Sequence, residues 1–405
     1  MRLFVTMTQN VELFEPVRGN EVKLYVCGVT PYDTAHLGHA FTFASFDILI
    51  RLMRSKGWKV TFVENVTDID DPLFAKAEQL GNISWEELAQ QETDRFVREM
   101  QSIQVTMPDH FVRASEELPA MFDLIAKLLQ NGNAYINDGW IYFSVKSDPN
   151  YAALASAAGL NGYENLLNTA NENGNNGGDA RKRDPLDFLL WRGRSEGDPA
   201  EWDSPWGKGR PGWHIECSAM ATKYLGPQID IHGGGSDLIF PHHSSEIAQT
   251  ENATGQRPYV RFWMHIGMVA LDGQKMSKSL GNLVIVGKLL ERYTPNAVRV
   301  ELARHHYREP WEFFYDEMDD SQRIAHAIDR AVNGRPPINH LKYTDKTPVY
   351  RQQFMDALEE DLNTPEAVAL LQMFTEELLR GDLSEDDAIA AQRAIRETSA
   401  LLGLK

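Results

Sequence analysis

Two short motifs in this chain combine residue types that can bind and neutralise phosphate. The first is His36-Leu37-Gly38-His39, which follows a β-rich segment and opens an apolar-periodic stretch. Free N–H groups at a helix start attract phosphate, and two imidazoles there can donate hydrogen bonds to it. The second is Lys275-Met276-Ser277-Lys278-Ser279, whose lysines can follow the charge that develops on a triphosphate. Either motif alone predicts little, because a histidine at a helix start is more often a cap, but the pair predicts ATP-dependent chemistry.

A metal site is the second kind of chemistry that the residue types allow. The chain has two cysteines, Cys27 and Cys217, and it places His242 four residues before Glu246. This spacing puts the last two side chains on one face of a helix, and two thiolates, an imidazole and a carboxylate form a zinc-binding set. The alternative is that the cysteines are small apolar core residues, with His243 a neighbour that packs or caps.

A third pattern is typical of strand ends that hold a nucleotide. The acidic run Asn65–Asp71 and the glycine-rich run Gly233–Asp237 each follow a predicted strand. Three glycines in a turn would let the backbone contact a ribose or adenine, and Asp237 could accept from ribose hydroxyls. Taken singly, each run is also compatible with an ordinary solvated turn.

The elements around these motifs predict an α/β fold. Glu21–Thr30 is predicted to be a strand, a helix follows to about Lys56, and a second strand covers Lys59–Asn65. Such a unit is best satisfied in a parallel sheet with right-handed crossovers. Ligands bind at the carboxyl ends of the strands in sheets of this kind, where the motifs lie.

Further elements define the expected domains. We predict helices over Ser84–Gln104 and Ala114–Asn131, a hairpin over Ala134–Val145, and a strand over Gln228–His232 between helices that start near Gly212 and His243. The Asn- and Gly-rich stretch from about Asn161 to Arg183 is predicted to be an exposed, mobile loop. Beyond about Thr294 the pattern is helical to the end, in pieces ending at Gly334, Glu360, Arg380 and Leu402. We therefore expect a catalytic domain over 1–294 with an inserted segment at about 132–210, and a helical bundle over 295–405.

Composition excludes several classes of protein. The 405 residues are 42% hydrophobic, which is enough for a packed core, and two cysteines 190 positions apart cannot form a disulfide scaffold. The chain shows no signal peptide and no apolar run long enough for a membrane span, so we expect a cytoplasmic protein, which we take to be a monomer. A net charge of −18 disfavours a broad nucleic-acid surface.

The two phosphate motifs resemble the signature pair of class I aminoacyl-tRNA synthetases. Leu24–Gly28, Gly212–Met220, His232–Leu238 and Phe240–His243 resemble the cysteinyl-tRNA synthetase family in particular. The resemblance covers nearly the whole chain, and it implies a Rossmann-like catalytic domain with an insertion and a C-terminal helical bundle. It also implies that a carboxylate attacks ATP to give an acyl-adenylate and diphosphate.

The same resemblance implies roles for individual residues. The catalytic residues would be His36, His39, Lys275 and Lys278, with ATP bound together with Mg²⁺. One zinc ion would be held by Cys27, Cys217 and His242, with Glu246 an open fourth ligand, and would bind the substrate thiol directly so that serine is rejected. The cysteinyl-adenylate pocket would be lined by Cys27, Gly28, Val29, Thr30, Thr42, Asn65, Val66, Thr67, Trp213, Gly235, Ser236, Asp237 and Val269, with Lys278 reaching the phosphates.

Several segments resemble a relative of the tRNA enzymes, the ligase that joins cysteine to glucosaminyl-inositol in mycothiol biosynthesis. They are Pro31 and Ala40 beside the first motifs, Gly177-Gly178-Asp179 before Lys182–Asp187, and His305–Phe313. The second match is partial, since Asn175-Asn176 and Ala180 replace the relative's charged flanks. Glu246 favours the tRNA enzymes slightly.

The length and charge of the chain also favour glucosaminyl-inositol as the molecule that accepts the cysteine. The tRNA enzymes continue beyond the bundle into a segment that contacts the anticodon, whereas this chain stops at Lys405, and its last 60 residues are acidic and amphipathic. We expect an AMP-forming ligase whose substrates are L-cysteine, ATP and glucosaminyl-inositol, without tRNA. Two alternatives stay open, a short cysteinyl-tRNA synthetase and a degenerate paralogue that only binds a nucleotide or a partner.

Overall fold

A five-stranded parallel sheet forms the centre of the molecule. The computed structural model describes residues 1–32, 35–276, 281–335, 346–381 and 383–405. The strands lie in the order β11 (Val260–Ile266), β10 (Ile229–Gly235), β3 (Glu21–Val29), β4 (Lys59–Val66) and β5 (His110–Arg113). The four neighbouring pairs all run parallel, and the expected α/β class is confirmed.

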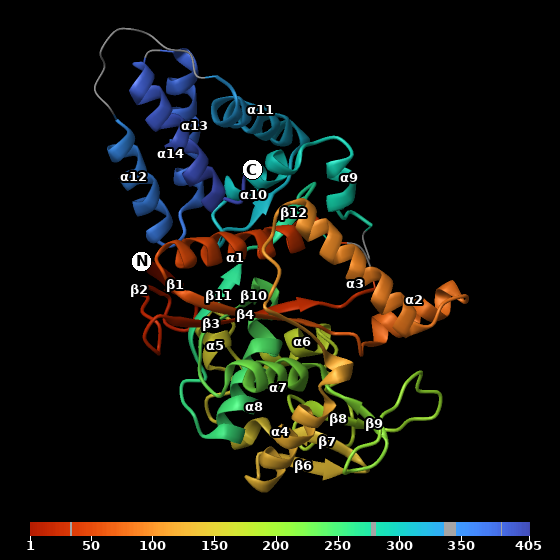
Figure 1. Ribbon diagram of the computed structural model, residues 1–405. Helices are drawn as coiled ribbons and strands as arrows, with labels where there is room; N and C mark the ends of the chain where they lie inside the picture. The colour runs from red at the N-terminus through yellow and green to blue at the C-terminus, as the bar shows by residue number, and fades with distance from the viewer. Residues whose placement is uncertain (33–34, 277–280, 336–345, 382) are drawn as a thin grey trace.

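Two helices cover opposite faces of this sheet (Figure 1). Helix α1 (Leu37–Ser55) packs with Leu24 and Val26 of β3, whereas α7 (Trp213–Leu225) packs on the side of Tyr25 and Cys27. Side chains alternate between the faces of a strand, so neighbouring residues of β3 serve two separate cores. Cys27 thus points toward α7, the helix that contains the other cysteine.

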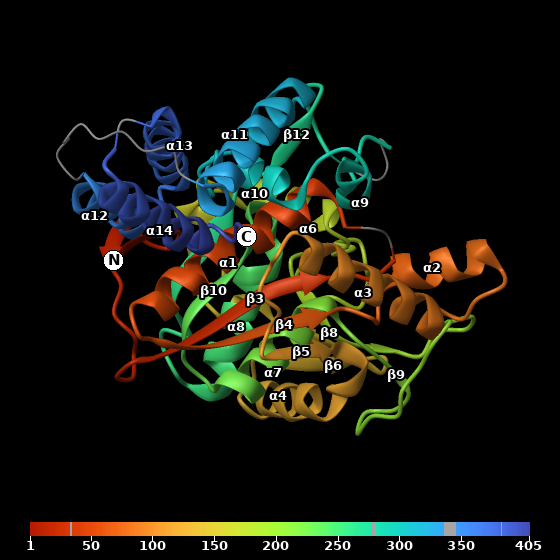
Figure 2. The ribbon, with the colours of Figure 1, turned by 45° about the horizontal axis from the view of Figure 1, so that its top comes forward.

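The segment predicted to be an insertion contains a small antiparallel sheet, which we call the inserted sheet. Its strands β6 (Ala134–Asn137), β7 (Trp140–Phe143), β8 (Phe188–Gly193) and β9 (Gly209–Pro211) pair in sequence order. The first two form the expected hairpin, with Asp138 and Gly139 at positive φ of 52° and 75°. In Figures 1 and 2, α2 (Asp71–Leu80) and the loop between β8 and β9 project from the same side of the molecule.

The Asn- and Gly-rich stretch corrects one expectation. Half of the predicted loop is helix α6 (Tyr163–Glu172), and the remainder folds back on itself. The side chain of Asn171 accepts a hydrogen bond from the Gly177 amide at 2.8 Å, and Lys182 Nζ donates to the Asn175 carbonyl at 2.9 Å. Amide side chains satisfy the backbone locally, which is why a composition typical of loops forms a definite structure.

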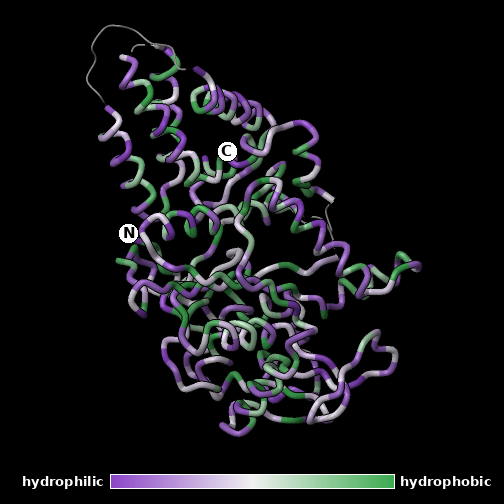
Figure 3. Tube along the Cα trace, in the orientation of Figure 1, coloured by the Kyte–Doolittle hydropathy of each residue, from purple (hydrophilic) through white to green (hydrophobic). Residues whose placement is uncertain are grey.

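The C-terminal part is a helical bundle packed above α1. Its helices are α10 (Pro295–Ala303), α11 (Tyr315–Asn333), α12 (Thr347–Glu359), α13 (Thr364–Arg380) and α14 (Glu385–Leu401). The pattern is not wholly helical as predicted, because β14 (Trp311–Glu312) pairs with β12 (Val269–Leu271), which in turn pairs with β13 (Gln274–Lys275). This short sheet connects the beginning of the bundle to the segment that follows β11. In Figure 3, α11 mixes hydrophilic and hydrophobic residues along its length, as a helix with one buried side requires.

The remaining elements have the following bounds. They are β1 (Arg2–Val5), β2 (Asn10–Leu13), α3 (Trp85–Ser102), α4 (Leu118–Gln130), α5 (Ala153–Ala157), α8 (Ser244–Thr254) and α9 (Val286–Leu290), with short helical turns at Ala114–Glu116, Val145–Ser147, Ser236–Leu238 and Ile239–His243. Among the described helices, none combines the length and apolarity needed to cross a membrane.

Candidate functional site

Four side chains from separate elements meet on the α7 side of the sheet. Cys27 comes from the end of β3, Cys217 from α7, His242 from the turn before α8, and Glu246 from α8. The two sulfur atoms are 3.9 Å apart, Cys27 Sγ is 3.7 Å from Glu246 Oε1, and His242 Nε2 is 3.2 Å from the same oxygen. The structure thus brings together all four residues that the sequence suggested as ligands, and all four are buried.

Two further histidines lie against this group. Nε2 of His232, in β10, is 3.5 Å from Cys27 Sγ, and Nε2 of His243 is 3.4 Å from it. With Cys27 and Glu246 they form a second set of donor atoms close enough to hold one ion. The sequence reasoning treated His243 as a packing neighbour and missed His232. Its position follows from strand pairing, since His232 is in register with Tyr25 of β3.

Other imidazoles orient these histidines. The Nδ1 atoms of His214 and His242 are 2.9 Å apart. Nδ1 of His243 is 2.7 Å from Nε2 of His265, and Nδ1 of His265 is in turn 2.7 Å from Thr6 Oγ1. Burial lowers the pKa of His214 and of His265 to about 3, so both rings are neutral at pH 7. In each case one ring nitrogen is occupied by a neighbour, which leaves Nε2 facing the cluster.

The cluster fits a divalent cation. Burial raises the pKa of the Cys27 thiol and of the Glu246 carboxyl well above their ordinary values, and Glu246 Oε2 has no hydrogen-bond partner among the described residues. Burying two thiolates and a carboxylate is unfavourable unless positive charge accompanies them. Thiolate, imidazole and carboxylate donors together are those that zinc prefers.

A cavity of about 270 Å³ opens beside the cluster. Asn65 shapes one wall, since its Oδ1 accepts from the Gly28 amide at 2.9 Å and its Nδ2 donates to Thr67 Oγ1 at 3.0 Å. Trp213 stacks on His242 with ring centroids 4.3 Å apart. We call this the cysteine cavity; its lining is Cys27, Gly28, Val29, Thr30, Tyr32, His36, His39, Asn65, Thr67, Trp213, Cys217, Leu238 and His242.

A second cavity of about 220 Å³ continues from it along α1. His36 and His39 face both cavities and stack on each other with centroids 3.8 Å apart. His36 is also the N-cap of α1, and its Nδ1 accepts from the amides of Gly38 and His39 at 3.1 and 3.4 Å. The capping role and the ligand-facing position, which the sequence presented as alternatives, coexist. Thr42, Gly235, Asp237 and Val269 also line this second cavity.

The glycine run has a different conformation from the one predicted. Gly233, Gly234 and Gly235 are not a turn but the last residues of β10, paired with β11. A Cβ atom on Gly233 would lie 2.0 Å from Cζ of Phe46 in α1. Gly233 is therefore required by the packing of α1 on the sheet. Of the three glycines, only Gly235 lines either of the two cavities described above.

Most of the other predicted site residues lie together, with four exceptions. Val66 is buried in β4 and Ser236 lies in the turn after β10, and neither lines the two cavities. Lys275 is the last residue of β13, and Met276, which follows it, lines the second cavity. Lys278, with the rest of the serine-lysine motif from Ser277 on, lies outside the described residues.

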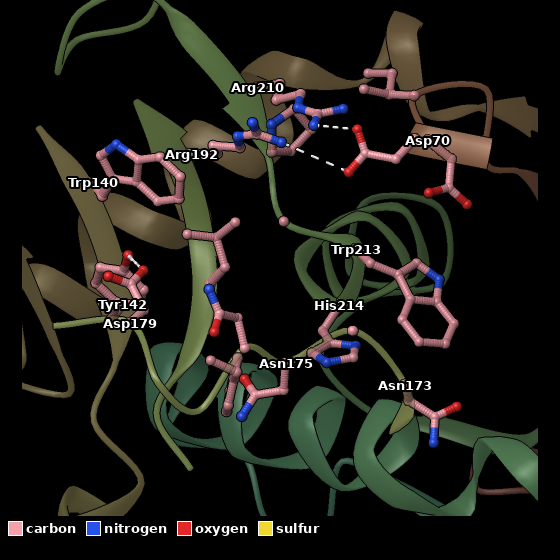
Figure 4. A pocket seen from close by; sticks show the side chains of 18 of the residues that line it. Asp70, Trp140, Tyr142, Asn173, Asn175, Asp179, Arg192, Arg210, Trp213 and His214 are labelled. Carbon is pink, nitrogen blue, oxygen red and sulfur yellow. Dashed lines mark hydrogen bonds and ion pairs between the residues drawn. The ribbon is translucent and has the colours of Figure 1, made fainter. Parts of the chain in front are cut away.

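A third and larger cavity was not anticipated. It measures about 650 Å³ and lies between the inserted sheet, α7 and the start of α2. Figure 4 shows Trp140, Tyr142 and Asp179 on one side of it and Trp213 and His214 on the other. We call it the outer cavity; it shares Thr30 and Trp213 with the cysteine cavity and is also lined by Ile69, Asp70, Asp71, Pro72, Asn173, Gly174, Asn175, Asn176, Arg181, Lys182, Phe188, Leu189, Arg192, Arg210, Pro211 and Gly212.

Charges in the outer cavity are mostly paired. Asp179 accepts hydrogen bonds from Tyr142 Oη at 2.6 Å and from Arg181 Nε at 2.9 Å. Burial would raise the pKa of Asp179, but these hydrogen bonds outweigh it and lower the pKa to about 2. Burial lowers the pKa of Lys182 to about 8. Arg192 and Arg210 both form ion pairs with Asp71. Three of the four cations therefore already have a carboxylate partner.

Comparison with known families agrees with this architecture. Residues 13–323 match the model of the class I (C) tRNA synthetase catalytic domain, and residues 353–404 match the DALR domain model. Among solved structures, the chain is similar to Mycobacterium tuberculosis methionyl-tRNA synthetase in complex with methionyl-adenylate. The TM-score is 0.63 at 16% identity, over 95% of this chain and 90% of that one. This likeness shows the fold.

Curated relatives carry two different names. The chain is 42% identical over 407 residues to the cysteine–tRNA ligase of Alkalilimnicola ehrlichii, covering 98% of this chain and 84% of that protein. It is 38% identical over 426 residues to the cysteine–tRNA ligase of Thermodesulfovibrio yellowstonii, with 100% and 85% covered. It is also 40% identical over 406 residues to the L-cysteine:1D-myo-inositol 2-amino-2-deoxy-alpha-D-glucopyranoside ligase of Thermomonospora curvata, with 100% and 94% covered.

Proposed function

The chain belongs to the class I tRNA synthetase family of cysteine ligases, and we propose that it joins cysteine to the amine of glucosaminyl-inositol, the ligase reaction of mycothiol biosynthesis. The proposal has two steps. L-Cysteine and ATP give cysteinyl-AMP and diphosphate, and the amine then displaces AMP to form an amide. The coarser activity, an ATP-dependent ligase that uses cysteine, is common to the named relatives.

In this proposal the two inner cavities hold the adenylate. Zinc, held by Cys27, Cys217 and His242 with Glu246 as the open fourth ligand, would supply a site for the substrate thiolate that a serine hydroxyl fills poorly. Thr67 and Trp213 would hold the amino and carboxyl end of cysteine. His36, His39, Lys275 and Lys278 would neutralise the phosphates, so that activation depends on positioning and charge stabilisation.

One observation supports the small amine as acceptor. Gly177-Gly178-Asp179, a partial match to the mycothiol-type ligases, precedes Arg181 and Lys182, which line the outer cavity, and Asp179 itself faces that cavity. The other distinguishing residues lie elsewhere; in His305–Phe313, for example, Tyr307 and Arg308 bind Asp361 at the base of the bundle. A cavity of about 650 Å³ that mixes aromatic and hydrogen-bonding side chains suits a ligand of disaccharide size.

A cysteinyl-tRNA synthetase is the second candidate, favoured by the names of several relatives. The outer cavity could admit the end of an RNA strand, and phosphate binding relies on cationic side chains. Arg181, Arg192 and Arg210 are cationic, but each already forms an ion pair with an aspartate. This pairing favours a polar acceptor without phosphate groups over a polyanion.

One assay separates the candidates. Enzyme, ATP and cysteine are incubated with glucosaminyl-inositol in one tube and with cysteine-specific tRNA in another, and AMP release is followed. We expect release with the amino sugar. Release with tRNA alone would refute the ligase proposal, and absence of cysteine-dependent ATP–diphosphate exchange would indicate a paralogue without activity.

We also propose the domain boundaries expected from the sequence. Residues 1–294 would form the catalytic domain with the insertion at about 132–210, and residues 295–405 the helical bundle. Limited proteolysis checks this division: a first cut near residue 294, with the two fragments still associated, is the expected result. A first cut in the middle of the catalytic domain would contradict it.

A further inference from the structure

Asp70 occupies an unusual position at the start of α2. It is the N-cap residue of that helix, yet its side chain makes no capping hydrogen bond. An N-cap aspartate normally accepts from the first free amides of its helix, which stabilises the helix. Here the carboxylate instead accepts from Thr30 Oγ1 at 3.2 Å and lines the outer cavity. The side chain thus faces a ligand-sized space and makes no capping hydrogen bond to its helix.

This carboxylate lies where the two cavities meet. Thr30, its hydrogen-bond partner, lines both the cysteine cavity and the outer cavity, and so does Trp213. A cysteinyl group bound beside the cysteine cluster must present its carbonyl toward this boundary for an acceptor to reach it from the outer side. The acceptor nitrogen would then arrive next to Asp70.

We propose that the acceptor amine occupies the outer cavity with its nitrogen at Asp70, and that the Asp70 carboxylate accepts a proton from this nitrogen. This inference rests on the proposed function. The amine is an ammonium ion at neutral pH and must lose two protons to become an amide N–H. Asp70 takes the first, which frees the nitrogen lone pair. That pair forms the C–N bond as the bond between the carbonyl carbon and the AMP oxygen breaks. AMP leaves with the electrons of that bond, and the second proton passes to water.

The charges around Asp70 suit this role. Asp71 on the same helix turn engages Arg210 of β9 and Arg192 of β8, so neither arginine forms an ion pair with Asp70 in the structure. Asp68 is held by the amide and hydroxyl of Ser115. On α7, Glu216 is fully buried, and burial raises the pKa of its carboxyl well above the ordinary value.

The pKa of Asp70 itself agrees with the geometry. Burial raises it to about 6, and the charge of Asp71 adds to the increase, whereas hydrogen bonds from Thr30 and from the Asp71 amide and the charge of Arg210 oppose it. A general base works best when its pKa lies close to the working pH. Asp70 is ionised at pH 7 and basic enough to hold a proton briefly.

The test compares Asp70→Asn with the wild type in three assays. Cysteine-dependent ATP–diphosphate exchange should stay within about twofold, because Asp70 does not line either of the two inner cavities in which activation is proposed to occur. Ligation to glucosaminyl-inositol should fall by about 10²- to 10⁴-fold in kcat/KM. Trapping of the adenylate by hydroxylamine, which is already unprotonated at neutral pH, should be retained. In the wild type the acidic limb of the ligation profile should follow a group near pH 6, and the variant should lack it.

Asp123→Asn, an exposed carboxylate in α4, is the matched control and should behave as the wild type. Unchanged ligation and an unchanged pH profile in Asp70→Asn would overturn the assignment. Equal losses in exchange, ligation and hydroxamate formation would also overturn it, because they indicate a structural role. If the wild type itself fails to ligate glucosaminyl-inositol, the proposed function and this inference fall together, and that result is distinct from the other two.

Discussion

His214 holds His242 by one buried hydrogen bond, and we expect its replacement by alanine to weaken zinc binding. The two Nδ1 atoms are 2.9 Å apart, and His242 is 1% exposed, so solvent cannot take the place of the lost partner. Leaving a buried polar group unpaired costs about 1–3 kcal/mol, which at about 1.36 kcal/mol per tenfold is a loss of roughly 5- to 160-fold in affinity. Removing such partners from metal-binding imidazoles typically costs about 10- to 100-fold, in the same range.

The assay is competition for zinc between the protein and a chromophoric chelator. His214→Asn is the matched variant, because its side-chain amide can place a hydrogen-bonding atom close to the position of Nδ1 while removing most of the ring. We expect His214→Ala to lose affinity and His214→Asn to recover much of it. Equal zinc affinity in the wild type and His214→Ala, or equal loss in both variants, would refute the idea that this hydrogen bond orients a ligand.

Three further predictions concern the metal cluster and the core. Cys217→Ser should lose bound zinc and cysteine-dependent exchange together, and full zinc content in that variant would contradict the site. Gly233→Ala should lower the free energy of unfolding in urea by about 1–3 kcal/mol, because the new Cβ overlaps the ring of Phe46. A second change, Phe46→Leu, should recover part of this loss. Additive effects of the two changes would show that the two positions do not interact. Asp47→Asn should cost about 3–5 kcal/mol, since it leaves Arg299 buried without its carboxylate partner at 2.7 Å. Burial would raise the pKa of Asp47, but the charge of Arg299 and the other interactions of this carboxylate together outweigh it and lower that pKa. The ion pair therefore stabilises the fold fully above the ordinary aspartate pKa of 3.8, and this stabilisation is lost as the pH falls through the lowered pKa. The variant should therefore show a weaker acid dependence of stability, measured by unfolding between about pH 2 and 6.

Local patterns were enough to predict the elements that carry the chemistry. The strand over Glu21–Thr30 and the helix after His36 follow from β-formers, a turn and apolar periodicity, and both are present. The pattern failed where side chains rather than periodicity determine the structure. Asn171 and its neighbours satisfy their own backbone, so a segment with loop composition is ordered. Gly233 needs no turn conformation and is instead required by a ring from another element.

The sequence by itself determined which chemical groups are available, namely two thiols, the histidine motif at a helix start, and the glycine and aspartate segments at strand ends. These features depend only on residue type and on short spacings along the chain, and both can be read from the sequence. Only the tertiary structure decided which groups meet. His232 reaches Cys27 because β10 pairs with β3 in one register, and His214 reaches His242 because α7 packs against α8. The outer cavity exists because the inserted sheet stands across from the start of α2, so that Asp70 and Asp179, 109 positions apart, line the same space. Such contacts depend on strand order and packing between distant segments, and no local spacing in the chain specifies them.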